Sequence, residues 1–202
     1  YQVDSSLTVL QAAKACGYNI PTLCAWRDGK CSLASCRVCL VRLVGTPRLV
    51  PSCVWPVSEG LNISISDPMA VQARRTSVEL LLSNHSMNCQ SCNKNGQCEL
   101  LEIARIVGAR ADAFKGEKTK PTYDDASNGI VRDTSKCVLC GRCVNACEKI
   151  QGLGVLNFIN RGFKTTVGPV FDLSLKDVNC IQCGQCINVC PVGALHEKET
   201  IH

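Results

Sequence analysis

The sequence predicts an α+β fold in three successive domains, each organised around a group of cysteines. Seventeen of the 202 residues are cysteines, and most of them recur at short, repeated spacings. Only 4% of the residues are aromatic, so the chain has few large rings with which to fill a core. We expect bound metal to replace part of that core, in domains that span residues 1–66, 67–112 and 113–202.

Residues 1–66 predict a small sheet packed on one short helix. An apolar-periodic run at residues 9–16 predicts the helix, and Gly17 ends it. Cys16 lies on this run without a neighbouring cysteine, so we expect it to be a packed core thiol. Strands are expected at residues 1–4, 38–44, 48–54 and 61–66, the last of which alternate between apolar and polar side chains.

Four cysteines of this first domain have the spacing of a [2Fe-2S] site. The spacing C-x11-C-x2-C-x13-C puts two ligands on a tight loop and two on flanking segments. Such a loop at the edge of a small sheet predicts a β-grasp ferredoxin domain. Cys31 leaves a second possibility open, because it also fits the plant-type spacing C-x4-C-x2-C, and we favour Cys24 on the family resemblance given below. The expected ligands are Cys24, Cys36, Cys39 and Cys53.

The second domain, residues 67–112, is predicted to be helical and to hold a [4Fe-4S] cluster. Asp67 and Pro68 are typical of a helix start, and this helix is expected to run to about residue 83. Another helix is expected after Cys98 and ends at Gly108. A lone histidine after a helix is usually solvated, but here three cysteines that lack a fourth ligand follow in the spacing H-x3-C-x2-C-x5-C. The expected ligands are therefore His85, Cys89, Cys92 and Cys98.

The third domain contains two copies of the spacing C-x2-C-x2-C-x3-C, and Pro191 follows the second copy. This spacing is typical of bacterial ferredoxins with two [4Fe-4S] clusters, in which the fourth cysteine of each run binds the cluster of the other run. Two zinc sites are the alternative, although zinc does not require this shared spacing. One cluster is expected on Cys137, Cys140, Cys143 and Cys190, and the other on Cys147, Cys180, Cys183 and Cys186.

Two segments of the third domain lie outside the cysteine runs. Residues 113–130 are polar and rich in turn-forming residues, which predicts a linker or surface loop. Residues 155–160 and 163–170, around Arg161 and Gly162, predict a hairpin between the two cysteine runs.

The charge and hydropathy of the chain argue against a nucleic acid or a membrane as partner. The formal net charge is +5, but the thiolates and iron of the expected clusters would lower it to about −2. Basic residues are scattered without interleaved aromatic residues, and no stretch approaches eighteen uninterrupted apolar residues. We expect a cytoplasmic location, because no stretch reads as a signal peptide or as a membrane span, and in such a reducing compartment CxxC groups indicate metal sites rather than disulfides.

Over essentially the whole chain, the order of these motifs resembles the amino-terminal accessory region of [FeFe] hydrogenases. The likeness is greatest to the large subunit of multimeric, NAD(P)-linked and often electron-bifurcating members. Complex I and the diaphorase of NAD-reducing [NiFe] hydrogenases share the first two modules, but the two further cysteine runs favour a hydrogenase. The segments that carry the resemblance are Ile20-Pro21-Thr22-Leu23-Cys24, Ser35-Cys36-Arg37-Val38-Cys39, Ala73-Arg74-Arg75-Thr76, Val131-Arg132-Asp133-Thr134-Ser135-Lys136-Cys137 and Asn160-Arg161-Gly162-Phe163.

The resemblance implies an electron relay within a hetero-oligomeric oxidoreductase, with no catalytic residue among these 202. Expected partners are a flavin- and NAD(P)-binding redox subunit, a small [2Fe-2S] subunit and a soluble ferredoxin. Family members begin with a strand before Tyr1 and continue past His202 into the hydrogen-activating domain, so a fragment of a longer chain is expected. The alternative is a complete, non-catalytic electron-carrier subunit of a diaphorase, formate dehydrogenase or transhydrogenase.

Overall fold

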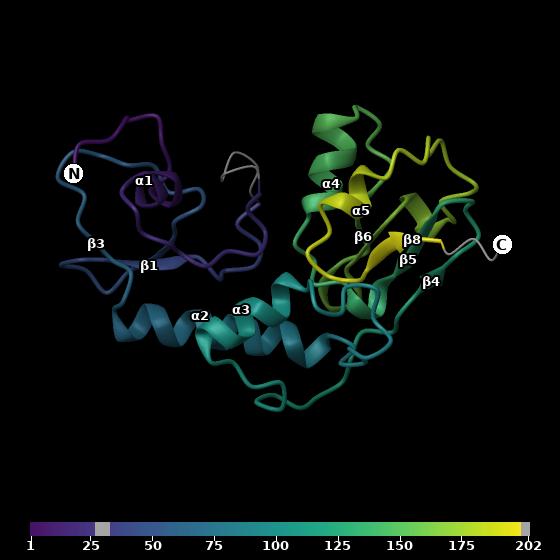
Figure 1. Cartoon of the computed structure of the whole chain (residues 1–202), viewed down its shortest axis with the longest axis horizontal. Helices are drawn as coiled ribbons and strands as arrows, with labels where there is room; N and C mark the ends of the chain where they lie inside the picture. The colour runs from purple at the N-terminus through teal and green to yellow at the C-terminus, as the bar shows by residue number, and fades with distance from the viewer. Residues whose placement is uncertain (27–32, 199–202) are drawn as a thin grey trace. The chain divides into compact units, whose positions relative to one another are not determined.

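The computed structural model describes residues 1–26 and 33–198, which form two compact units. The first unit comprises Tyr1–Leu81 with Leu100–Phe114, and the second comprises Leu82–Glu99 with the chain from Lys115 onward. Helices and strands are mixed throughout, as the cartoon shows (Figure 1), and this confirms the predicted α+β class. The division into three domains stays a prediction.

The first unit contains one short helix and a three-stranded antiparallel sheet. Helix α1 (Val9–Ala15) begins at Thr8, whose side chain accepts a hydrogen bond from the Gln11 backbone while the Gln11 side chain accepts one from the Thr8 backbone. The helix ends where Gly17 adopts a φ of +82°, a conformation that glycine adopts without strain. The sheet has the order β2-β1-β3 and consists of β1 (Leu40–Leu43), β2 (Leu49–Pro51) and β3 (Ile63–Ser64).

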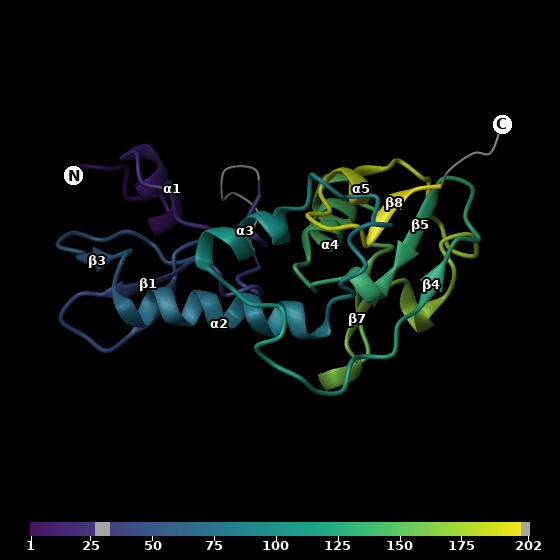
Figure 2. The same cartoon turned by 60° about the horizontal axis from the view of Figure 1, so that its bottom comes forward.

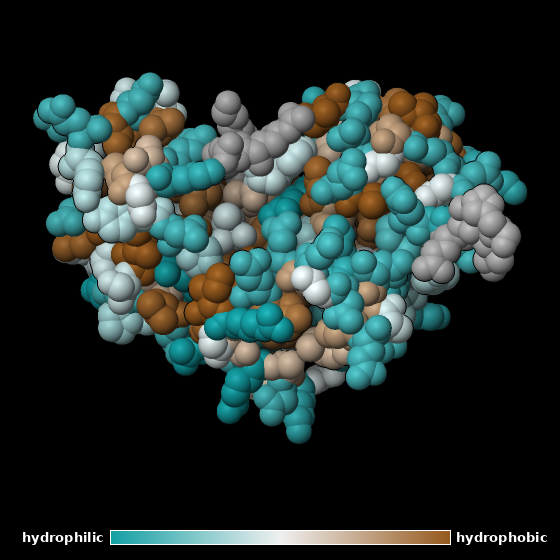
Figure 3. Space-filling view, in the orientation of Figure 1, coloured by the Kyte–Doolittle hydropathy of each residue, from teal (hydrophilic) through white to brown (hydrophobic). Residues whose placement is uncertain are grey.

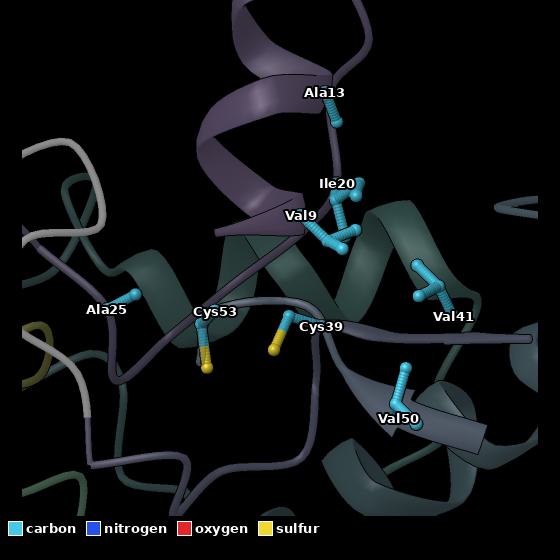
Figure 4. Close-up of a cluster of buried hydrophobic side chains, with 8 residues drawn as sticks. All are labelled: Val9, Ala13, Ile20, Ala25, Cys39, Val41, Val50 and Cys53. Atoms are coloured by element: carbon cyan, nitrogen blue, oxygen red, sulfur yellow. The ribbon is translucent and has the colours of Figure 1, made fainter. Parts of the chain in front are cut away.

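A small apolar core joins α1 to this sheet and includes two of the predicted ligands. Val9 and Ala13 of the helix pack with Val41 and Val50 of the sheet, together with Cys39 and Cys53 (Figure 4). Two expectations for this region are wrong. Residues 1–4 form no strand, and Cys16 is only partly buried because it caps the exposed end of α1 rather than facing the core.

Two longer helices follow. Helix α2 (Pro68–Asn84) begins after Asp67, whose carboxylate accepts a hydrogen bond from the Met69 backbone at 2.9 Å and pairs with Arg42 at 3.1 Å. Helix α3 (Glu99–Val107) buries Leu100, Ile103, Ala104 and Val107, and ends at Gly108 with a φ of +64°. The last turn of α2 and the first residue of α3 belong to the second unit, so both helices lead directly to residues of the predicted histidine-containing site.

The second unit is built on a three-stranded antiparallel sheet of order β4-β5-β8. The strands are β4 (Tyr123–Asp124), β5 (Ile130–Asp133) and β8 (Leu195–Glu197), and β5 and β8 run side by side in both cartoon views (Figures 1 and 2). The predicted hairpin is present as β6 (Asn157–Ile159) and β7 (Thr166–Gly168). The helical segments are η1 (Thr134–Lys136), α4 (Arg142–Asn145), the π-helix η2 (Ala146–Ile150), η3 (Gly162–Lys164), η4 (Val170–Asp172) and α5 (Gln185–Asn188).

The polar segment 113–130 is not wholly a loop, because β4 lies inside it. Asp124 is buried and accepts hydrogen bonds from the Leu175 backbone at 2.9 Å and the Ser174 hydroxyl at 2.8 Å. Burial alone would raise the pKa of the Asp124 carboxyl, but these hydrogen bonds outweigh burial and lower it. Strand β4 therefore has a polar sequence although it is part of the sheet, because its charged residue Asp124 is buried together with its hydrogen-bond partners.

Over the described ranges, no helix is long and apolar enough to cross a bilayer. Apolar and polar residues are interspersed on the face that Figure 3 shows. Several large apolar side chains are exposed in the second unit, including Phe163, Phe171 and Ile181.

Candidate metal centres

The four predicted [2Fe-2S] ligands are all buried, each with no more than 4% of its surface exposed. A hydrogen bond between the thiols of Cys24 and Cys36, together with burial, raises the pKa of Cys36. A hydrogen bond from the Cys53 thiol lowers the pKa of Cys39 to about 7 despite burial, and the charge of Cys24 also acts on Cys39. These interactions place all four sulfurs in one group, and Figure 4 shows the Cys39 and Cys53 sulfurs pointing into the same space. Cys31, the alternative ligand, lies outside the described residues.

A buried arginine adjoins this group. Arg74 of α2 is 5% exposed and donates a hydrogen bond from Nε to the Leu40 carbonyl at 2.7 Å. Its Nη2 is buried without a hydrogen-bond partner among the residues that the structure describes. Burial lowers the pKa of Arg74, and the charge of the Cys39 thiolate opposes this effect. A cation therefore lies beside the predicted [2Fe-2S] ligands.

His85 directly follows α2 and is buried rather than solvated, with 6% of its surface exposed. Within the described part of the chain, no group donates to or accepts from Nδ1, which is a buried nitrogen. Burial lowers the pKa of the ring, which also hydrogen-bonds to the Lys136 backbone. A neutral imidazole with one ring nitrogen hydrogen-bonded and the other free has the form of a metal-binding histidine.

The three cysteines that complete the predicted histidine-containing site lie in the loop between α2 and α3. Cys89, Cys92 and Cys98 are partly buried, and the Cys92 N–H donates to the Cys89 carbonyl at 3.2 Å. The Cys92 sulfur packs against the backbone of Gly193, where an added Cβ would lie only 2.6 Å from it. The shared coordination of His85 and these three cysteines stays a prediction.

The eight cysteines of the two repeated runs line two separate cavities. The first is lined by Cys137, Cys140, Cys143 and Cys190, together with β5 and β8 residues and Arg132. The second is lined by Cys147, Cys180, Cys183 and Cys186. Each cavity thus combines three cysteines from one run with the fourth cysteine of the other run, which is the crossed grouping that the spacing predicts.

Burial and mutual proximity raise the pKa of several thiols in these cavities. Burial raises the pKa of Cys137 to about 11 and that of Cys140 to about 12, with neighbouring thiolates adding to the effect. Burial and the charges of Cys180 and Cys183 likewise raise the pKa of Cys186 to about 12. Buried thiols with raised pKa values lose their protons only when a positive charge is added beside them, and a metal supplies that charge. Among the described residues, no three His, Cys, Asp or Glu side chains converge as ligands of a single ion would.

The two cysteine loops repeat the same backbone geometry. The residue before the second cysteine has a positive φ in each loop, +52° at Leu139 and +56° at Gln182. The residue after it is a glycine in the left-handed conformation, Gly141 or Gly184, and a short helix begins directly afterwards. The loop thereby turns its sulfurs inward, and the Leu139 N–H donates to the Cys137 sulfur at 3.4 Å.

Three charged residues at these sites, Arg132, Arg142 and Glu99, were not predicted from the sequence. Along the sequence, the basic residues of the chain are only scattered. Arg132 lines the first cavity and is 2% exposed. Arg142 lies inside the first cysteine run and forms a two-bond ion pair with Glu99, at 2.7 and 2.8 Å. The Glu99 N–H donates in turn to the Pro191 carbonyl at 3.1 Å. The one sequence feature that could have indicated a charge at this site is the position of Arg142 between two predicted ligands.

Models of known protein families match three consecutive parts of the chain. Residues 1–68 match a 2Fe-2S iron-sulfur cluster binding domain. Residues 74–112 match the NADH-ubiquinone oxidoreductase-G iron-sulfur binding region, and residues 136–194 match a 4Fe-4S dicluster domain. These matches confirm the predicted types of iron-sulfur domain.

Individual proteins match almost the whole chain. The NADP-reducing hydrogenase subunit HndD of Solidesulfovibrio fructosivorans is 42% identical over an alignment of 203 positions, which covers 98% of this chain and 35% of that protein. Iron hydrogenase 1 of Clostridium pasteurianum is 35% identical over 98% of this chain and 34% of its own length. The mitochondrial NADH-ubiquinone oxidoreductase 78 kDa subunit of Neurospora crassa is 30% identical over 97% of this chain and 26% of that protein. The chain spans about a third or less of the length of these relatives.

The fold of this chain is similar to that of a chain in a solved structure, over most of the length of both chains. The chain superimposes on a chain of the NAD+-reducing [NiFe]-hydrogenase in the H2-reduced state with a TM-score of 0.88 and 30% identity, covering 98% of this chain and 83% of that one. The cysteine motifs, the fold and the relatives therefore all indicate the same family. This chain belongs to the family of iron-sulfur regions that hydrogenases share with the large iron-sulfur subunits of NADH-ubiquinone oxidoreductase.

Proposed function

We propose that this chain is the electron-relay region of an NAD(P)-linked [FeFe] hydrogenase of the kind that can bifurcate electrons. The observation that carries the proposal is the match to an NADP-reducing hydrogenase subunit along 98% of the chain. Electrons would pass between a flavin- and NAD(P)-binding partner, a small [2Fe-2S] subunit or a soluble ferredoxin, and a hydrogen-activating centre outside these residues.

The chain would hold one [2Fe-2S] and three [4Fe-4S] clusters. The buried group of Cys24, Cys36, Cys39 and Cys53 supports the first, and the unpartnered Nδ1 of His85 supports a ligand role beside Cys89, Cys92 and Cys98. The two cavities support the crossed sets described above. When bound, such clusters exchange single electrons without bond cleavage. The protein residues hold the clusters, exclude water from them and direct charges and N–H groups at their sulfurs.

Metal analysis of the purified full-length protein tests this proposal. Residues 1–202 should contribute about fourteen irons, two from one cluster and four from each of three, with matching acid-labile sulfide, and the hydrogen-activating centre outside these residues adds its own iron. Electron paramagnetic resonance (EPR) of the reduced protein should separate one [2Fe-2S] signal from the signals of the cubes. Stoichiometric zinc, or iron near eight in a fully reconstituted sample, would contradict the proposed set of clusters.

A second function is favoured by the solved structure, of which this chain covers 83%. That coverage suits a complete electron-carrier subunit of a diaphorase-type complex, without a hydrogen-activating domain. The intact mass of the native protein decides between the two. A chain several hundred residues longer than the present sequence supports the hydrogenase, whereas a mass near 21.8 kDa supports the carrier subunit.

A further inference from the structure

Arg132 is a buried cation whose hydrogen-bonding capacity is only partly used. Its side chain is 3% exposed and forms an ion pair from Nη1 to Asp172 at 2.9 Å, and Nη1 also donates to the Val167 carbonyl at 3.3 Å. Asp124 lies 4.0 Å from Nε. Within the described ranges, neither Nε nor Nη2 has a hydrogen-bond partner. A buried guanidinium with two unsatisfied nitrogens is costly, so a further acceptor is expected nearby.

The cavity of Cys137, Cys140, Cys143 and Cys190 offers that acceptor. Arg132 is one of its lining residues, and its charge acts on Cys137, where it opposes the effect of burial on the thiol. Asp124 and Asp172 pair with the guanidinium but do not line the cavity. Sulfur atoms in the cavity would therefore be the remaining acceptors for the free N–H groups.

The backbone around Arg132 keeps space for the guanidinium. A Cβ at Gly168 of β7 would lie 2.7 Å from Nη1, so a larger residue there would displace the side chain. Asp172 reaches Nη1 from a turn in which Phe171 and Asp172 both have positive φ, +61° and +54°. Two consecutive non-glycine residues in this conformation are strained, and the ion pair compensates for part of that strain.

The second cavity has no equivalent cation. Its described lining consists of apolar residues, Gln185 and the four cysteines, with no Lys or Arg. Burial and the charges of Cys180 and Cys183 are the largest effects on the pKa of Cys186 there, and they raise it. The two cubes would thus have the same type of ligands but different surrounding charge.

We propose that Arg132 donates hydrogen bonds to the sulfurs of the cluster on Cys137, Cys140, Cys143 and Cys190, and thereby makes it the more easily reduced of the two cubes. This inference rests on the proposed function, because it needs both clusters. Reduction adds one electron, taken from the other cube or from an external mediator, and breaks no bond. A nearby positive charge and N–H donors stabilise the added negative charge, so they raise the reduction potential.

Redox titration of the full-length protein, followed by EPR, tests the inference. Arg132→Gln should lower the midpoint potential of one cube and leave the others unchanged. Asp172→Asn should raise the same midpoint, because it removes a carboxylate that partly neutralises Arg132. Arg132→Lys should give a smaller decrease than Arg132→Gln, since it keeps the charge but not the guanidinium geometry.

Two further variants complete the experiment. Cys147→Ser, which should lack the second cube, assigns the shifted midpoint to the first. Arg161→Gln removes a positive charge from an exposed position and should shift neither midpoint. Unchanged midpoints in Arg132→Gln with both cubes present, or shifts of the same sign in Arg132→Gln and Asp172→Asn, would overturn the inference.

Cluster content distinguishes this failure from failure of the proposed function. If wild type itself lacks one of the two cubes, the proposed function fails whatever Arg132 does. If Arg132→Gln cannot assemble its cube, Arg132→Lys and Asp172→Asn still report opposite shifts, and their absence would still overturn the inference.

Discussion

The two cysteine cavities of the second unit have the same backbone geometry but different electrostatic surroundings. In each cavity, three of the cysteines belong to a run in which the residue before the second cysteine and the glycine after it both have the left-handed backbone conformation. Positive charges of Arg132, Arg142 and Lys94 act on cysteines of the first cavity, whereas the described lining of the second contains no Lys or Arg. The ligand spacing therefore determines which cluster can bind, and residues outside the spacing set its electron affinity.

The largest expected effect is the loss of one cluster. Cys190→Ser should remove the cube of the first cavity, because Cys190 lines that cavity although it belongs to the second cysteine run. Iron content should fall by about four per chain, with the EPR signal of the other cube retained. Cys186→Ser is the matched variant and should remove the other cube. If Cys190→Ser and Cys186→Ser remove the same cube, the crossed grouping is wrong.

A positive charge placed in the second cavity should reduce the difference between the cubes. Gln185 lines this cavity and begins α5, so Gln185→Lys should raise the midpoint potential of the second cube. Asn188→Lys adds the same charge to an exposed position of the same helix and should have little effect. Potentiometric EPR of both variants checks this prediction, and equal shifts in the two would show that only the net charge of the chain matters.

Displacing Arg132 without removing it should have an intermediate effect. Gly168→Ala introduces a methyl group in the space of Nη1, so the guanidinium must move and the midpoint of the first cube should fall by less than in Arg132→Gln. Gly116→Ala serves as the control, because a Cβ there meets nothing within 4 Å and its φ is not positive. A midpoint that does not move in Gly168→Ala, with the cube intact, would show that the position of the guanidinium is unimportant.

The smallest effect is expected for Glu99→Gln. The Arg142–Glu99 pair has one buried and one partly exposed partner, at 8% and 43% exposure of the side chains, so its loss should cost roughly 1 kcal/mol. Heating should then bleach the visible absorbance of the clusters somewhat sooner than in wild type. Glu102→Gln alters an exposed residue of the same helix, and its clusters should bleach at the rate of wild type. Faster bleaching in both Glu99→Gln and Glu102→Gln would show that the charge of the helix, and not the ion pair, causes the effect.

The sequence predicts the parts of these sites that depend on local spacing. The cysteine runs, the helices that begin at Thr8 and Asp67, and the hairpin of β6 and β7 follow from neighbouring residues, and the structure contains these elements. The family matches confirm the predicted iron-sulfur domain types. The assignment of individual ligands stays a prediction, including the choice between Cys24 and Cys31.

The charged surroundings were not predictable because they depend on contacts between distant segments. Arg132 meets Asp172 across 40 positions of sequence, through a strained turn that no local preference of Phe171 indicates. Likewise, Arg142 and Glu99 are 43 residues apart. A basic residue in a sequence gives no sign of whether it is buried, and burial is what makes these charges effective.

The contact between Gly193 and the Cys92 sulfur also bears on the distance between two of the proposed clusters. Gly193 lies three residues after Cys190, so the backbone that follows a predicted ligand of the first cube touches a sulfur of the predicted histidine-containing site. Electron tunnelling weakens steeply as the gap between donor and acceptor grows. A Cβ at position 193 would lie 2.6 Å from the Cys92 sulfur, so any side chain there would have to displace one of the two segments and lengthen the gap between the proposed clusters. The missing side chain would thus keep the path between the two proposed clusters short.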